Sequence, residues 1–225
     1  MTSERGVFLE AAQDFEITVA DTPAALGIAY RLRHQVCCIE RGYEPGQDIL
    51  ETDRFDRRAG HVLLTQRSTG RVVGTGRVVP PSLEGPGADL PMQLLCSRDV
   101  FRALPMGRTG EIGPFAIATD LHDAACAGSM PLRLGLMRGV VQLSAGMGIT
   151  HWCTVMEHTL LRPLRANAIY FQPLGPAIEH HGLRQPSWGC IDDVLARLRH
   201  ERPAVWDYVT EGGSLWQQQA DAMAA

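Results

Sequence analysis

The fold is decided by the stretch HVLLTQRSTGRVVGTGRVV, residues 61–79. Its two ends are largely apolar, and Arg67-Ser68-Thr69-Gly70 between them is a turn signal. We therefore predict an antiparallel hairpin of residues 61–66 and 71–79. Pro80 and Pro81 end it, because proline cannot donate to a strand ladder.

Strand and helix patterns alternate outward from the hairpin, which predicts a mixed α/β fold. Before the hairpin we expect a strand at 15–20, a helix that Asp21-Thr22-Pro23 caps and that runs to about Cys38, and a loop at 39–59. After it we expect a long excursion at 81–108, a central strand at 110–118, a helix at 132–147, a strand at 150–156, a short helix at 157–166, a strand at 169–172, further strand and turn at 175–191, and a last helix from about Ile191.

Composition describes one ordinary globular domain. The chain has 225 residues and a mass of 24.6 kDa, so we expect a single domain over 1–212 and a frayed tail over 213–225. The net charge of -4 and the pI near 6.0 argue against nucleic-acid binding. No apolar run is long enough to span a membrane, and the six cysteines lack CxxC spacing, so we expect a protein of the reducing cytoplasm. The adjacent Cys37 and Cys38 are interpreted as small buried hydrophobic residues without a disulfide.

Three carboxylates, Glu51, Asp53 and Asp56, lie within six residues of the loop. Carboxylates this close repel one another unless a positive group shares their space. We expect Arg33 and Arg77 to supply it, so that the cluster forms an electrostatic cage beside an acceptor pocket. The alternatives are a solvated acidic loop and a calcium site, although the EF-hand register is missing. The two arginines are either ion-pair struts or clamps for an acceptor carboxylate, and we favour struts.

Ordered motifs between residues 28 and 190 carry a family resemblance. The motifs Arg33-x-x-Val36-Cys37, Gly42-Tyr43, Glu51-x-Asp53-x-x-Asp56, Gly76-Arg77-Val78-Val79 and Glu111-x-Gly113-Pro114-Phe115-Ala116 resemble those of the acyl-homoserine-lactone synthases. The later motifs Gly148-Ile149-Thr150-His151-Trp152, Met156-Glu157, Leu160-Leu161-Arg162, Pro173-Leu174-Gly175-Pro176 and His181-Gly182-Leu183-Arg184-Gln185-Pro186 more closely resemble the long-chain N-acyl amino acid synthases and acyltransferases associated with the exosortase protein-sorting system.

This resemblance, with the element order, implies a GNAT-like fold of the autoinducer-synthase type, with three layers, helix, sheet and helix, around a mixed and mostly antiparallel sheet. It also implies transfer of a fatty acyl group from the phosphopantetheine thioester of acyl carrier protein to the amine of an amino acid or related acceptor, without a tightly bound cofactor. The lactone synthases have an aromatic residue where Cys37 stands and an arginine where Pro114 stands, so their S-adenosylmethionine-dependent reaction is the alternative. Tyr43 replaces their tryptophan and keeps an aromatic wall. A catalytically silent acyl-binding or regulatory module is the alternative from another class.

The chemistry of amine attack on a thioester can be assigned to residues of the central strand. The reaction needs a base for the amine proton and a donor for the oxyanion. Proline inside a strand breaks its ladder, and Glu111 lies three residues before Pro114. Our hypothesis is that Glu111 takes the proton, directly or through water, while a backbone N–H near Phe115 polarises the carbonyl. The structural alternative is that Glu111 is only an ion-pair partner of Arg77 or Arg33.

Further residues are candidates for binding the acyl donor. Trp152 and Met156 could line an acyl-chain tunnel, although plain core is the commoner role of such residues. Residues 128–135 lack the glycine pattern that cradles the pyrophosphate of CoA, which favours a carrier protein as donor. We expect this acidic partner to bind a patch of four arginines, Arg133, Arg138, Arg162 and Arg165. The alternative is that these arginines only form a solvated helix surface.

Other potentially reactive groups receive less weight. His151-x-Cys153 and Glu179-His180-His181 contain metal-ligand types, but neither HExxH nor CxxC spacing accompanies them, so we expect no metal site. Cys153 as an acylated nucleophile is disfavoured, because a strand cysteine beside a tryptophan is usually part of the core.

Overall fold

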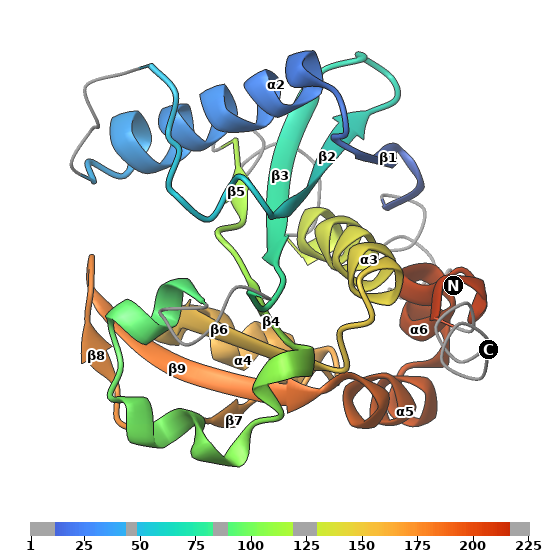
Figure 1. The fold of residues 1–225 in the computed structure, drawn as a ribbon. Coiled ribbons are helices and arrows are strands. Elements are labelled where there is room, and N and C mark those ends of the chain that lie inside the picture. The colour runs from blue at the N-terminus through green and yellow to red at the C-terminus, as the bar shows by residue number, and fades with distance from the viewer. Residues whose placement is uncertain (1–11, 44–48, 83–89, 119–129, 217–225) are drawn as a thin grey trace.

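The computed structural model describes residues 12–43, 49–82, 90–118 and 130–216. Within them, nine strands form one sheet in the order β1-β2-β3-β4-β6-β9-β7, with β5 beside β3 and β8 beside β9 (Figure 1). Of the strand pairs in this described part, only β4 with β6 is parallel. The strands are β1 (Phe15–Val19), β2 (Gly60–Gln66), β3 (Val72–Val79), β4 (Thr109–Ile112), β5 (Ala116–Ile117), β6 (His151–Glu157), β7 (Gln172–Pro173), β8 (Ile178–Glu179) and β9 (Leu183–Cys190).

Helices cover both faces of this sheet (Figure 1). Neighbouring residues of β2 point to opposite faces, so Leu63 packs in the cluster of α2, whereas Val62 and Leu64 pack in the cluster of α3. The predicted three-layer α/β architecture is confirmed. The helices are α2 (Pro23–Arg33), a π-helix that continues it (His34–Glu40), α3 (Met130–Gly146), α4 (His158–Ala166), α5 (Ile191–Glu201) and α6 (Pro203–Thr210), with short 3₁₀ helices at Pro91–Leu94, Arg98–Ala103 and Met106–Arg108.

The predicted hairpin and the first helix are confirmed, and each has a local cause. β2 and β3 pair in antiparallel register on either side of the predicted turn. At the start of α2 the Thr22 hydroxyl accepts a hydrogen bond from the Ala25 N–H at 3.2 Å, and Pro23 occupies the first turn. The C-terminal part of the predicted helix differs, because residues 34–40 widen into a π-helix.

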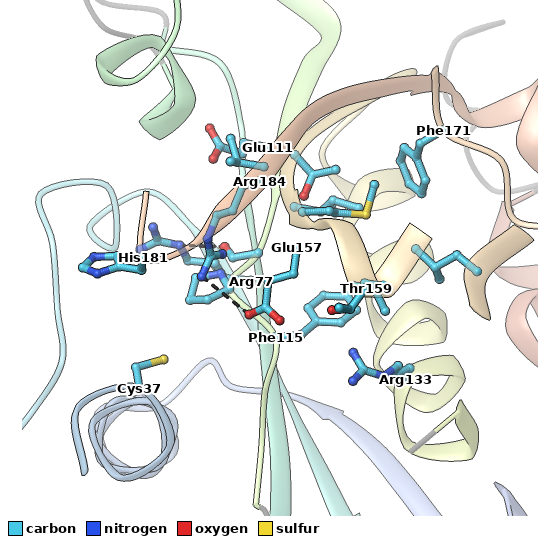
Figure 2. A pocket seen from close by; sticks show the side chains of 18 of the residues that line it. Cys37, Arg77, Glu111, Phe115, Arg133, Glu157, Thr159, Phe171, His181 and Arg184 are labelled. Carbon is cyan, nitrogen blue, oxygen red and sulfur yellow. Dashed lines mark hydrogen bonds and ion pairs between the residues drawn. The ribbon is translucent and has the colours of Figure 1, made fainter. Parts of the chain in front are cut away.

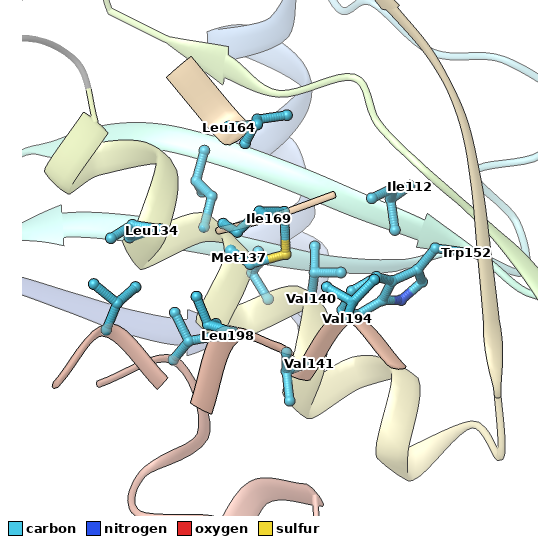
Figure 3. Packing of buried hydrophobic residues seen from close by; sticks show 14 of the residues in the cluster. Ile112, Leu134, Met137, Val140, Val141, Trp152, Leu164, Ile169, Val194 and Leu198 are labelled. Carbon is cyan, nitrogen blue, oxygen red and sulfur yellow. The ribbon is translucent and has the colours of Figure 1, made fainter. Parts of the chain in front are cut away.

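Helix α3 lies close to the sheet because glycines face the strands. A Cβ atom added to Gly135 or Gly139 would lie 2.8 Å from the side chain of Leu64 or Val62, respectively. On another side of α3, Met137, Val140 and neighbouring residues pack with Trp152, Leu164 and Leu198 in the main core (Figure 3). This packing fixes the position of α3 relative to β6.

Some predicted elements differ from the structure. The expected strand at 169–172 is wrong: only Gln172 and Pro173 pair as β7, and Ile169 and Phe171 lie in the main core. The expected excursion at 81–108 carries three 3₁₀ helices in its described part. Residues 214–216, assigned to a frayed tail, are helical, and the Trp216 indole donates to Asp192 at 2.7 Å. Residues 217–225 lie outside the described part of the chain.

The predicted central strand is interrupted, and this break positions the site. β4 ends at Ile112, a cis Gly113–Pro114 peptide follows, and β5 then continues beside β3 alone. β4 pairs with β6 only from His151 to Cys153. Within the described residues, β6 beyond Cys153 pairs only with β9 on its other side. The sheet therefore opens between the break and the second half of β6.

Candidate active site

A cavity of about 810 Å³ occupies the place where the sheet opens. Its floor contains the end of β4 with Pro114 and Phe115, and the second half of β6 from Thr154 to Glu157. The π-helix, α3 and α4 supply further walls. A cavity of this size accommodates a ligand of drug-like or fatty-acyl dimensions.

Glu111 lies in this cavity as a nearly buried carboxylate. Its side chain lines the cavity, and its Oε2 accepts a hydrogen bond from the Met92 N–H at 2.7 Å. Burial raises the pKa of Glu111 to about 8, against the opposing effects of that hydrogen bond and of Arg77. Neither Arg33 nor Arg77 forms an ion pair with Glu111, since both pair with the acidic loop. The ion-pair alternative for Glu111 is therefore not what the structure shows.

Phe115 follows the break and contributes to the cavity wall. Among the described residues no hydrogen-bond acceptor is found for its backbone N–H. Further along this segment, the Ala118 N–H donates to the Val73 carbonyl of β3 at 2.9 Å. The Phe115 N–H is therefore a spare donor at the edge of the opening, as the hypothesis of an oxyanion donor requires.

The acidic loop and the two arginines form the predicted cage. Arg77 donates to both carboxylate oxygens of Asp53, at 2.9 and 2.6 Å, and to Asp56. Arg33 donates to Asp56 at 2.7 Å and also to Glu51. The ion-pair interpretation of this cluster is confirmed, and both guanidiniums act as struts.

Arg77 also connects this cage to the broken strand. Its Nε donates to the Gly113 carbonyl at 3.0 Å, while the Gly113 N–H donates to the Arg77 carbonyl at 3.1 Å. Glu51, Asp53 and Arg77 line the cavity, whereas Arg33 and Asp56 lie behind it. The cage thus holds the Phe115 segment in place and presents net negative charge on the side of Glu111.

His61, which the sequence did not single out, lies at the back of the cage. It is 1% exposed, and its Nε2 is 3.5 Å from Asp56 Oδ1. Burial lowers the pKa of His61 to about 4, so the imidazole is neutral at physiological pH. For Asp56, burial works to raise the pKa, but attraction to Arg33 and Arg77 outweighs it and holds the pKa below its usual range. Asp56 therefore stays ionised between two guanidiniums.

The rim of the cavity carries a second polar cluster, which the sequence did not assign. Glu157 accepts a hydrogen bond from Arg41 at 2.8 Å and lies 3.6 Å from Arg184, its cross-strand neighbour on β9. Arg184 also donates to the Tyr43 hydroxyl at 2.8 Å. The Tyr43 ring stacks on His181 with ring centroids 4.4 Å apart, so the expected aromatic wall exists. Only the pairing of β6 with β9 brings Glu157 and Arg184 together.

Figure 2 shows how these groups are distributed. Glu111, Arg184 and His181 lie on one side of Phe115, and Arg133 lies on the other. The charged groups of the cavity therefore lie on two sides of Phe115.

The remaining wall is apolar and extends between α3 and α4. Met156 lines it, as expected for an acyl-chain site. Trp152 does not line it: the side chain is fully buried, and the indole donates to Ser144 at 2.8 Å. The other apolar lining residues include Phe115, Met130, Leu134, Met137, Leu160, Leu164, Ile169 and Phe171.

The four arginines expected to bind a carrier protein do not form one patch. Arg133 lines the cavity from the start of α3. Arg162 and Arg165 are exposed on α4 and, three residues apart, share a face. Arg138 lies elsewhere: it pairs with Glu211 and packs over Tyr208 of α6.

Neither Cys153 nor Cys37 is an activated nucleophile. Burial raises the pKa of Cys153 well above its usual value, and the side chain is fully buried. Burial also raises the pKa of Cys37 to about 11; this thiol lines the cavity from the π-helix, so it is not simply a core residue as expected. Within the described residues no group of three metal-ligating side chains is present. In the same part of the chain no helix is both long and apolar enough to cross a membrane.

Comparison with known proteins agrees with this architecture. Residues 32–130 match the family model described as the acetyltransferase (GNAT) domain. The fold and this match support an acyltransferase with a GNAT domain. No curated protein sequence matches the chain.

Solved structures identify the branch of this fold to which the chain is similar. FeeM, an N-acyl amino acid synthase from uncultured soil microbes, superimposes with a TM-score of 0.62 at 15% identity, over 81% of this chain and 93% of its own. BjaI, a CoA-dependent acyl-homoserine lactone synthase, gives 0.60 at 21% identity, over 88% of both chains. The AHL synthase LasI gives 0.59 at 18% identity, over 77% and 88%. The predicted autoinducer-synthase type of fold is confirmed.

Proposed function

We propose that the chain is an N-acyltransferase that moves a fatty acyl group from the phosphopantetheine thioester of acyl carrier protein to the amine of an amino acid or related acceptor. The observation that carries this proposal is the buried Glu111 carboxylate in a cavity that also has a long apolar wall. An acetyl group would not need such a wall, whereas a fatty acyl chain gains free energy from each methylene that it buries there.

The residues support direct attack of the amine on the thioester. The amine nitrogen bonds to the carbonyl carbon, its proton passes to Glu111, and the carbonyl oxygen takes negative charge beside the Phe115 N–H. Collapse breaks the carbon–sulfur bond, and the leaving thiolate of phosphopantetheine takes up the proton. A carboxylate with a pKa of about 8 suits this exchange, because it can both accept and return a proton near neutral pH.

The choice of a carrier protein as donor rests on charge and sequence. Arg162 and Arg165 present an exposed basic face on α4, and Arg133 lines the adjoining end of the cavity. An acidic carrier protein would bind this basic face, and its phosphopantetheine would enter the cavity beside Arg133. We place the reaction in the cytoplasm, consistent with the free thiols of Cys37, Cys38, Cys96, Cys153 and Cys190.

The second candidate is an acyl-homoserine-lactone synthase, because the fold matches BjaI and LasI about as closely as FeeM. One experiment separates the two. The protein is incubated with acyl carrier proteins loaded with different acyl chains, a mixture of amino acids and S-adenosylmethionine, and the products are identified by mass. An N-acyl amino acid supports the proposal and a lactone supports the second candidate. Absence of any acyl product, with the donor consumed by neither reaction, would identify a silent acyl-binding module.

A further inference from the structure

The rim cluster of Arg41, Tyr43, Glu157, His181 and Arg184 has no role in the transfer step itself. Its two guanidiniums share a single carboxylate, Glu157, so the rim carries excess positive charge. The cage shows the opposite balance, since Arg33 and Arg77 face three carboxylates. The cavity is therefore negative near Glu111 and positive at the rim.

Two hydrogen bonds hold the Arg184 guanidinium in place and leave its Nη1 available as a donor. Its Nε donates to the His180 carbonyl at 2.6 Å and its Nη2 to the Tyr43 hydroxyl at 2.8 Å. Among the described residues no hydrogen-bond acceptor is found for its Nη1, although the side chain lines the cavity. Arg41 likewise uses Nη1 for Glu157, and it lines the same cavity.

The cage arginines have little hydrogen-bonding capacity left for a ligand, since four of the five N–H groups of Arg77 already donate within the protein. Every nitrogen of the Arg77 guanidinium donates to Asp53, Asp56 or Gly113. Arg33 is 1% exposed and lies outside the cavity lining. An anionic group that enters the cavity on the side of Glu111 is therefore bound better by the rim arginines than by the cage arginines, whose charges are already balanced by three carboxylates.

We propose that Arg184, assisted by Arg41, binds the carboxylate of the acceptor and so selects amino acids over simple amines. This inference rests on the proposed function, and it adds the residues that determine acceptor class. The acceptor ammonium would lie toward the negative cage and Glu111, and its carboxylate toward the positive rim. A planar guanidinium braced by Tyr43 and His180 suits bidentate binding of a carboxylate.

The test is a cycle of two acceptors and four proteins. The acceptors are the amino acid that gives most product in the mass assay and its carboxamide, which keeps the amine and removes the charge. The proteins are the wild type, Arg184→Gln, Arg41→Gln and the control Arg67→Gln, whose arginine is exposed in the β2–β3 turn and pairs with Glu16. For each acceptor the variant is compared with the wild type, so the intrinsic reactivity of the amine cancels.

We expect Arg184→Gln to lower kcat/KM for the amino acid by about 10- to 100-fold and to leave the carboxamide nearly unchanged. Arg41→Gln should show a smaller loss of the same selectivity, because Arg41 already gives its Nη1 to Glu157 at 2.8 Å. An equal loss for both acceptors would overturn the inference. An increase in the KM for acyl carrier protein alone would also overturn the inference. It would indicate that Arg184 and Arg41 bind the phosphate of the donor's phosphopantetheine and not the acceptor carboxylate.

Failure of the inference differs from failure of the proposed function. If the wild type acylates amino acids but Arg184→Gln leaves the ratio of kcat/KM for the amino acid to that for the carboxamide unchanged, the function stands and the inference is overturned. If no amine is acylated by any of the proteins, the proposed function itself is wrong and the inference falls with it.

Discussion

The Glu111 carboxylate accepts a hydrogen bond of 2.7 Å from the Met92 N–H, and this bond joins the interrupted central strand to the first 3₁₀ helix of the long excursion. The second oxygen of the carboxylate has no ion-pair partner in Arg33 or Arg77. One oxygen thus fixes the group, and the other is available to a substrate amine in the cavity.

Replacing Glu111 with glutamine should separate catalysis from folding. The amide oxygen can still accept from the Met92 N–H, so the melting temperature should change little. Turnover should fall by about 10²- to 10⁴-fold, because the amide cannot take the amine proton. Steady-state kinetics and thermal unfolding measure the two effects. Glu16→Gln, which alters an exposed ion pair with Arg67, serves as the matched control. Unchanged turnover in Glu111→Gln would contradict the assignment of Glu111 as the base.

The pH profile of turnover should report the same group. A base acts only when it is unprotonated, and burial raises the pKa of Glu111 to about 8. The rate should therefore rise with pH through about 8 and then level off, and this step should be absent from Glu111→Gln. Profiles are recorded with two acceptors whose amines have different pKa values. A step that follows the acceptor amine and persists in the variant would contradict the prediction.

The cage should be a major source of stability. Replacing Asp56 with asparagine leaves Arg33 and Arg77 buried without their shared carboxylate. We expect a loss of about 3–5 kcal/mol in the free energy of unfolding, measured by urea titration. The control Asp99→Asn breaks an exposed pair with Arg102 and should cost less than about 1 kcal/mol. Similar losses in both variants would show that the buried cage contributes no more to the free energy of unfolding than an exposed ion pair does.

Acid should weaken the same cage. The pKa of Asp56 is lower in the folded chain than its ordinary value of 3.8. Its ionised form therefore stabilises the fold above pH 3.8, and this contribution is lost as pH falls through the lower folded-state value. The difference in unfolding free energy between the wild type and Asp56→Asn should narrow as the pH falls below 3.8. A difference that stays constant down to the lowest pH at which the wild type folds would count against this account.

The apolar wall should set the length of the acyl chain. Leu160 of α4 lines the cavity and is only partly buried, so Leu160→Trp should narrow the wall without forcing a large side chain into the core. We expect kcat/KM to fall at least about 10-fold for long-chain donors and little for short-chain donors, since only long chains reach the obstruction. The matched control is Ile28→Trp, at a partly exposed position of α2 outside the cavity lining. Equal effects on all chain lengths would place the acyl chain elsewhere.

The sequence by itself determined the layer architecture and the cage. The hairpin at 61–79 follows from alternation and a local turn, and the start of α2 follows from a cap; both signals act over a few residues. The ion pairs of Glu51, Asp53 and Asp56 with Arg33 and Arg77 could also be foreseen, because clustered carboxylates require positive partners wherever the chain folds.

Only the tertiary structure decided which residues face the cavity. Trp152 and Met156 lie on the same strand, yet Trp152 is enclosed by α3 and Met156 lines the cavity, because β6 loses its β4 neighbour partway along its length. Arg138 lies on another face of α3 than Arg133 and pairs with Glu211, which follows α6. The rim cluster depends on the register of β6 with β9 and on the contact of Arg184 with Tyr43, which follows the π-helix. Such contacts join residues far apart in sequence, where no local pattern records them.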